Sequence, residues 1–175
     1  MSDWRAATVK IEIHSIESIE THAQLPFTPK TILISMGDTD AEPPRLNNRP
    51  DHILRIVFDD ITLEEIKTEY ELPESVTSSD DKLIEYLHTY GTHIFSDNQA
   101  RKIAQFVFRH KSSTDVLICQ CHYGQSRSAG CAAAITEHFN GNGIDIFADY
   151  RFYPNKLVFH KVLKALEACK NEQQR

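Results

Sequence analysis

One stretch decides the fold, and it lies about two-thirds of the way along the chain: Val116-Leu117-Ile118-Cys119-Gln120-Cys121-His122-Tyr123-Gly124-Gln125-Ser126-Arg127-Ser128-Ala129-Gly130. Its apolar start predicts a strand over 115–120, and its end predicts a helix from Ser128 to about Phe139. A short loop that feeds a helix leaves backbone N–H groups without partners, and the positive end of the helix dipole lies behind them. The stretch therefore predicts an anion site of a size that fits a phosphate.

Cys121 opens this loop, where the same positive field favours a thiolate over a thiol. We expect its pKa to fall from about 8.5 to a value in the range of roughly 3.5 to 7.5. Arg127 follows six positions later, and its planar guanidinium can hold two phosphoryl oxygens at once. Gly124 allows the loop to curl, and the Ser128 hydroxyl can donate a hydrogen bond to the sulfur. These residues predict a nucleophile inside an anion-binding loop.

The pattern C-x-x-G-x-S-R-S, from Cys121 to Ser128, resembles the phosphate-binding loop of the cysteine-dependent protein tyrosine and dual-specificity phosphatases. The resemblance implies a phosphatase-like fold and a phosphomonoesterase that acts on phosphotyrosine or another aryl phosphate. One residue departs from the family's usual pattern, because Gln120 stands where a histidine normally precedes the nucleophile. The backbone positions implied for phosphate binding are His122, Tyr123, Gly124, Gln125, Ser126 and Arg127.

A looser likeness to small bacterial phosphatase-like proteins covers Thr31 to about Lys170. It depends on two stretches, Leu54-Arg55-Ile56-Val57-Phe58-Asp59-Asp60 and Tyr153-Pro154-Asn155-Lys156-Leu157-Val158. The second stretch also has a purely structural interpretation, in which Asn155 caps backbone groups.

The resemblance further implies a cysteinyl-phosphate intermediate on Cys121 and an aspartic acid that protonates the leaving group. We favour Asp60 for this role over its neighbour Asp59, since both end the strand that precedes an inserted segment. Asp97 is closer to the cysteine in sequence, but as the residue after a helix cap it is better placed to serve the helix dipole. Three further side chains lie in a region that could fold over the pocket: Asp80, Asp81 and His93.

The whole chain sets broader limits. At 175 residues and 20.0 kDa it suits one domain over 1–175, with a core of about 31–170. The net charge of -6 argues against a nucleic-acid binder, and no apolar run approaches the length of a membrane span. Because Met1 to Arg5 lacks an apolar signal core, a cytoplasmic location with reduced thiols is expected. The histidines are scattered and the cysteines lack the paired spacing of zinc ligands, so the sequence predicts neither a metal site nor a cofactor. The oligomeric state stays open.

The remaining cysteines have two interpretations. Cys119 lies two positions before Cys121 and so faces the same side of the strand, which allows a reversible disulfide that protects the thiolate. The plainer interpretation is that Cys119 and Cys131 are small buried hydrophobic residues. Cys169 is expected on a surface helix.

Element patterns along the chain predict strands over 9–13, 31–36 and 52–58, with a surface loop over 41–50. Thr62 and Ser96 each begin a predicted capping box, and the second helix extends to about His110. The segment 74–81 is expected to be a loop, 82–90 a short helix, and Pro154 the start of the last helix. Strands that alternate with helices predict an α/β three-layer sandwich with a mostly parallel central sheet flanked by helices.

Two other functions compete with the phosphatase hypothesis. A pseudophosphatase that binds phosphorylated partners without turnover is compatible with Gln120 and with the distant position of the acid. A sulfurtransferase does not need Arg127 at its place, and arsenate-reducing relatives of the low-molecular-weight phosphatases carry their loop near the N-terminus. The loop contains no lysine, which gives no reason to prefer phosphoinositides over a phosphorylated protein or a small aryl phosphate.

Overall fold

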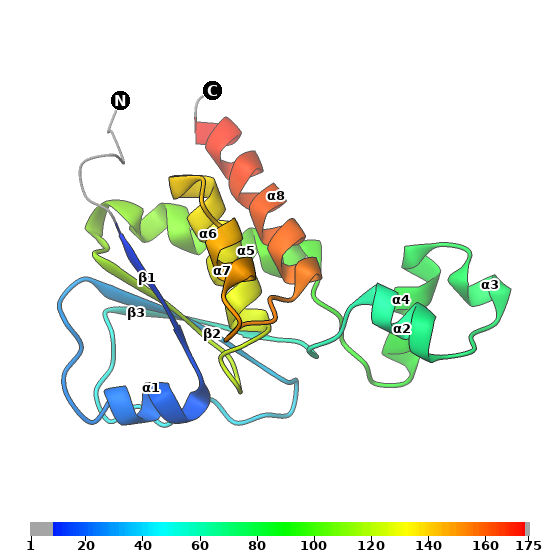
Figure 1. Ribbon diagram of the computed structural model, residues 1–175, viewed down its shortest axis with the longest axis horizontal. Coiled ribbons are helices and arrows are strands. Elements are labelled where there is room, and N and C mark those ends of the chain that lie inside the picture. Colours follow the sequence, from blue (N-terminus) through cyan, green and yellow to red (C-terminus); the bar gives the residue numbers. More distant parts are fainter. Residues whose placement is uncertain (1–8, 174–175) are drawn as a thin grey trace.

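The computed structural model describes residues 9–173, so the expectations for Met1 to Arg5, Trp4 included, concern residues outside this range. The described residues form one sheet with the strand order β1-β4-β2-β3, and every neighbouring pair is parallel (Figure 1). The strands are β1 (Lys10–His14), β2 (Thr31–Gly37), β3 (His52–Val57) and β4 (Val116–Gln120). All four predicted strands are present, with ends within about two residues of the predicted ones.

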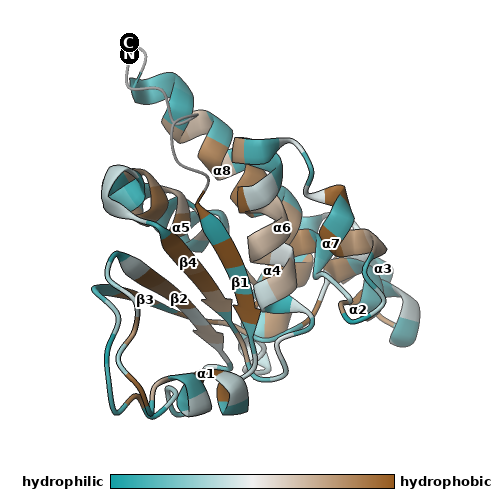
Figure 2. Cartoon of the chain, turned by 60° about the vertical axis from the view of Figure 1, so that its left-hand side comes forward, coloured by the Kyte–Doolittle hydropathy of each residue, from teal (hydrophilic) through white to brown (hydrophobic). Residues whose placement is uncertain are grey.

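Helices cover both faces of the sheet, as Figures 1 and 2 show. One face carries α5 (Asp97–His110), α6 (Arg127–Asn140) and α8 (Lys156–Gln173), with α7 (Ile144–Ala148) beside α6. The opposite face carries α1 (Ile16–His22) and the loops next to it. The predicted α/β sandwich with a parallel central sheet is thereby confirmed, since each parallel strand needs a long crossover that returns over a face of the sheet.

The core follows the two-residue period of the strands. Along β2, Ile32, Ile34 and Met36 belong to the large cluster under α5, α6 and α8. Leu33 faces the other way and packs with Ile19 of α1. Because β2 is buried on both faces, its sequence is almost continuously apolar and does not alternate, as the hydropathy colours of β2 and β4 show (Figure 2).

A small helical unit projects to one side of this sandwich between β3 and α5 (Figure 1). It consists of α2 (Leu63–Glu69), α3 (Glu74–Thr77) and α4 (Asp80–Thr89), which pack around Ile66, Leu83, Leu87 and Ile94. The prediction that 74–81 is a loop was wrong. Pro73, with its fixed φ, immediately precedes α3, and the Ser79 side chain accepts a hydrogen bond from the Lys82 N–H to cap α4.

Helix ends follow local sequence signals closely. Both predicted capping boxes are present, at Thr62 and Ser96, and α6 ends at Gly141 in the left-handed conformation (φ 72°). The last helix begins at Lys156, two residues after the predicted start at Pro154. The reason is Asn155, whose side-chain oxygen accepts a hydrogen bond from the Val158 N–H at 3.1 Å and so occupies the cap position.

Two short helices, α1 and α7, were not predicted. The first has a clear signal in retrospect, because the Ser15 side chain accepts a hydrogen bond from the Ser18 N–H. Within residues 9–173, no helix is both long and apolar enough to cross a membrane.

Candidate active site

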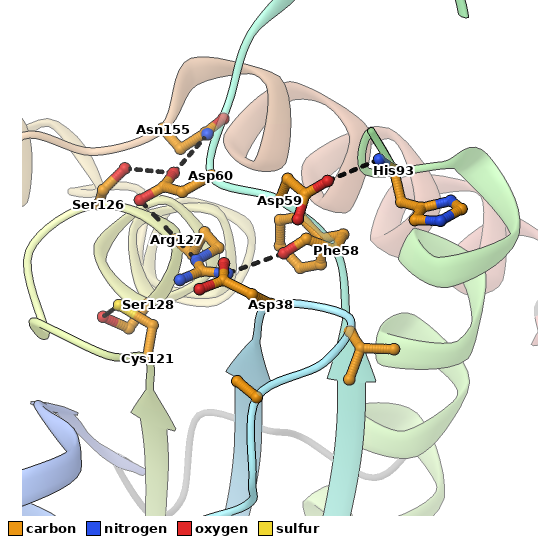
Figure 3. A network of polar contacts seen from close by, with 12 residues as sticks. Asp38, Phe58, Asp59, Asp60, His93, Cys121, Ser126, Arg127, Ser128 and Asn155 are labelled. Atoms are coloured by element: carbon orange, nitrogen blue, oxygen red, sulfur yellow. Dashed lines mark hydrogen bonds and ion pairs between the residues drawn. The ribbon is translucent and has the colours of Figure 1, made fainter. Parts of the chain in front are cut away.

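The site lies at the carboxyl edge of the sheet, where three parallel strands end side by side (Figure 3). Cys121 follows β4, Asp38 follows β2, and Asp60 comes three residues after β3. Parallel strands place their carboxyl ends at one edge, which is why residues far apart in sequence meet here. Of the predicted catalytic residues, the structure brings together Cys121, Arg127, Ser128 and Asp60.

The loop from Cys121 to Ser126 is anchored on the end of β1. The Cys121 N–H donates to the His14 carbonyl at 3.2 Å, and the Ile16 N–H donates to the His122 carbonyl at 3.0 Å. Gly124 has φ +69° and lies so close that a Cβ there would be 2.6 Å from the Ser15 nitrogen. The loop therefore needs a glycine at this position for two reasons, its left-handed conformation and its contact with another backbone.

The backbone donors of this loop are unpaired. From His122 to Arg127, no backbone N–H donates a hydrogen bond to any of the residues 9–173. They include the N–H of Arg127, the first residue of α6, where the helix dipole adds a positive field. A row of free donors at a helix N-terminus is the physical requirement for binding an anion.

The Cys121 thiol lies inside this arrangement with 2 % of its surface exposed. Its Sγ atom is 3.1 Å from the Oγ atom of Ser128, on the first turn of α6 (Figure 3). A hydroxyl at this distance can donate a hydrogen bond to a sulfur that carries negative charge.

Arg127 is buried and held by a strand end on each side. Its Nη1 atom donates to the Asp38 carboxylate and to the Phe58 carbonyl, both at 2.7 Å. Its Nε atom is buried without a hydrogen-bond partner among the described residues, and the nearest carboxylate oxygen, Oδ2 of Asp60, is 3.8 Å away. An unpaired N–H on a buried guanidinium is costly unless something accepts its hydrogen bond, so the arrangement favours an acceptor at this point.

Asp60 connects the loop to the start of α8. Its Oδ1 atom accepts hydrogen bonds from the Ser126 hydroxyl at 2.8 Å and from the Asn155 side-chain amide at 2.9 Å. The other candidate acids lie elsewhere. Asp59 turns toward His93, whose N–H donates to it at 2.6 Å (Figure 3).

Asp97 serves the helices and lies apart from the loop. It is the first residue of α5, directly after the Ser96 cap, and pairs with Lys161 at 2.8 Å, and this bond lowers the pKa of its carboxyl group. Asp80 pairs with Lys67 in the projecting unit.

Gln120 takes part in a buried polar chain behind Cys121. Its side-chain oxygen accepts from the Ser35 hydroxyl at 2.7 Å, and its amide nitrogen donates to the Cys121 carbonyl at 2.8 Å. The Ser35 hydroxyl in turn accepts from Arg55 at 2.8 Å. Burial and then the nearby charge of Arg127 lower the pKa of Arg55, which shows that two guanidinium groups lie close to this edge.

Cys119 contacts a different thiol from the one considered for a disulfide. All four cysteines are free, and Cys119 hydrogen-bonds with Cys131 of α6. This bond, and then burial, raises the pKa of the Cys119 thiol well above its ordinary value. Cys119 and Cys131 thus pack as buried core side chains, while a redox role for them stays a prediction.

The other side chains of the loop face outward. His122, Tyr123 and Gln125 are exposed, and the first two rings contact each other edge to face at 4.5 Å. The Gln125 carbonyl accepts a hydrogen bond from the Tyr153 N–H at 2.9 Å. The loop therefore presents these three side chains to solvent.

Within residues 9–173, one group of side chains has the spacing of metal ligands: Glu12, His14 and His22. The Glu12 carboxylate already pairs with Lys10 at 2.7 Å and with His14 at 3.0 Å. A lysine therefore supplies the positive charge that a metal would bring. The expectation of a metal-free protein stays a prediction.

Asp38, Arg55 and Asn155 belong to the site or its support, but were not assigned to it from the sequence. Arg55 and Asn155 carried a weak signal, since each stands in one of the two stretches on which the looser likeness to phosphatase-like proteins was based. Asp38 carried no such signal. Comparison of the chain with models of protein families gives no match, and neither does comparison with curated proteins.

Proposed function

We propose that this protein is a cysteine-dependent phosphomonoesterase that acts on phosphotyrosine or a similar aryl phosphate. The observation that carries the proposal is the arrangement of Cys121, the unpaired N–H groups from His122 to Arg127, and the buried Arg127 guanidinium around one point. The loop supplies a nucleophile and hydrogen-bond donors for the phosphoryl oxygens in one short segment. This combination is what phosphoryl transfer to a thiolate requires.

The reaction has two steps. In the first, the Cys121 thiolate attacks phosphorus, the sulfur–phosphorus bond forms, and the bond to the leaving oxygen breaks. Asp60 gives its proton to that oxygen. In the second, water attacks phosphorus and gives a proton back to Asp60, and the sulfur leaves with its charge stabilised by the Ser128 hydroxyl. The Arg127 Nε and the loop N–H groups bind the equatorial oxygens throughout.

Substitution of the nucleophile tests the proposal. Cys121→Ser should abolish hydrolysis of p-nitrophenyl phosphate, because a neutral hydroxyl replaces the thiolate. Cys169→Ser is the matched control, since that cysteine lies on α8, far along the chain from the loop. Its activity should remain within about twofold of the wild type. Wild-type activity in Cys121→Ser would refute the proposal.

A binding function without turnover is the second candidate. It is favoured by Asp60, which already accepts two hydrogen bonds from Ser126 and Asn155 and is thus engaged in holding the loop. A rapid mixing experiment with an aryl phosphate separates the two. An enzyme gives a burst of the aryl alcohol followed by steady release, whereas a pure binder shows affinity for vanadate and no release.

A further inference from the structure

A cavity of about 780 Å³ lies beside the loop and is larger than a phosphate group needs. Ser126, Asp60 and Asn155 line both the cavity and the candidate active site. From them the cavity extends along α2 and the first turn of α8. Neither Cys121 nor Arg127 lines it, so it is a neighbouring groove with room for another part of a substrate.

The lining of this groove is strongly acidic. It carries five carboxylates against one lysine and one histidine: Asp60, Glu64, Glu65, Glu69, Asp80, Lys156 and His160. Three carboxylates have partners, since Asp60 bonds Ser126, Glu65 belongs to the α2 capping box, and Asp80 pairs with Lys67.

Glu64 and Glu69 differ from these three. Both side chains are exposed on α2, and neither forms an ion pair with any of the residues 9–173. Within residues 9–173, two carboxylates of the groove are therefore free of ion pairs and accessible to a positively charged ligand.

The charges of the groove and of the loop have opposite signs and meet at Asp60. Among residues 9–173 the buried Nε of Arg127 has no hydrogen-bond partner, and it lies 3.8 Å from Oδ2 of Asp60, which lines the groove. A ligand that fits both the loop and the groove has a phosphate against the loop and positive charge along α2. Leu63, Pro154 and Leu157 also line the groove and can pack against the aliphatic part of an arginine or lysine side chain.

We propose that this groove binds the residues that flank a phosphorylated side chain and selects peptides with arginine or lysine there. The inference rests on the proposed function, because it assigns a substrate class to the same site. Acidic flanks would be repelled by the unpaired carboxylates of Glu64 and Glu69. The protein thereby prefers basic phosphopeptides to acidic ones.

The test uses two phosphotyrosine peptides of equal length that differ only in their flanks, which are arginine in one and glutamate in the other. We expect kcat/KM to be about tenfold higher for the basic peptide, equivalent to about 1.4 kcal/mol. The ratio should fall toward one in the double variant Glu64→Gln, Glu69→Gln, and at high salt. Glu85→Gln, an exposed glutamate on α4 outside the groove lining, is the matched control and should keep the wild-type ratio.

Two outcomes separate this inference from the proposed function. Hydrolysis of p-nitrophenyl phosphate together with equal rates for both peptides would overturn the inference and leave the phosphatase proposal intact. When no substrate is turned over, the phosphatase proposal fails. The groove is then tested by measuring, with fluorescence anisotropy, the affinity of the wild-type protein for each peptide. Equal affinities for the two peptides would then refute the proposed preference of the groove for basic flanks.

Discussion

At the scale of single residues, Asp60 joins three parts of the site. Its carboxylate contacts the loop through Ser126, the start of α8 through Asn155, and the guanidinium edge of Arg127. The favoured acid is thus the one among Asp59, Asp60 and Asp97 that lies against the loop. Its two roles, proton donor and anchor of the loop, make different kinetic predictions.

Asp60→Asn separates these roles because asparagine can still accept hydrogen bonds from Ser126 and Asn155 but has no proton to give. We expect turnover to fall by about a hundred- to ten-thousandfold for aryl phosphates with poor leaving groups, and by much less for good ones. The measurement is kcat against leaving-group pKa. Asp59→Asn, whose carboxylate faces His93, should show no such dependence. A uniform loss in Asp60→Asn would assign Asp60 to loop positioning alone.

The residues of the candidate active site differ in how far the sequence reveals them. Cys121, Arg127 and Ser128 lie within eight residues, in one loop and the start of one helix. Their spacing in the sequence therefore already predicts a common site. Asp38 follows β2 and Arg55 lies on β3, and nothing near either residue in sequence shows that it lies beside Arg127. Their proximity to Arg127 depends on the order of β2, β3 and β4 in the sheet.

At the scale of elements, the loop after β4 is held by its contact with the end of β1. Gly124→Ala should lower both stability and activity, since the new Cβ would press on the backbone of His14 and Ser15. Gly141→Ala is a well-matched control, with nearly the same φ and no heavy atom within 4 Å of its Cβ. We expect the control to cost about 1–2 kcal/mol from conformation alone and Gly124→Ala to cost clearly more in urea unfolding. Equal costs would show that the backbone contact is unimportant.

The contact between α6 and α8 predicts a dependence of stability on pH. His138 of α6 is almost fully covered, and burial lowers its pKa, while the Glu167 carboxylate at 2.7 Å acts in the opposite direction and Lys170 and Lys111 reinforce the lowering. In the unfolded chain its pKa returns to about 6.5, so below that value the unfolded state binds more protons. This site therefore destabilises the fold as the pH falls below about 6.5.

Urea unfolding at pH 7.5 and at 5.5 measures this effect. The free energy of unfolding should be lower at pH 5.5, and His138→Asn should reduce the difference between the two pH values. Glu167→Gln should enlarge it, because the variant removes the carboxylate that favours the protonated ring. An unchanged difference in both variants would show that other groups control the pH dependence.

At the scale of the whole molecule, the proposed anion site joins three strand ends and two helices, so an anion bound there should stabilise the entire fold. Vanadate at a hundred times its dissociation constant is expected to raise the free energy of unfolding by about 2.7 kcal/mol. In Arg127→Lys the rise at the same concentration should be much smaller, since lysine cannot bind two oxygens in the plane of a guanidinium. Arg109→Lys, an exposed residue of α5, should retain the full effect. A full effect in Arg127→Lys would place the anion elsewhere.

The sequence by itself determined the class of fold and the loop. Buried parallel strands need apolar runs, helices need caps, and a loop between them needs its glycine, so each of these features is recorded within a few neighbouring residues. The tertiary structure alone decided what surrounds the loop. Asp60 meets Ser126 across 66 positions of sequence, Asp38 meets Arg127 across 89, and Asn155 meets Asp60 across 95. They come together because parallel strands end at one edge and α8 begins beside it. The acidic groove along α2 has the same origin, since its lining comes from α2 and from the start of α8, which are far apart in sequence and meet only in the folded chain.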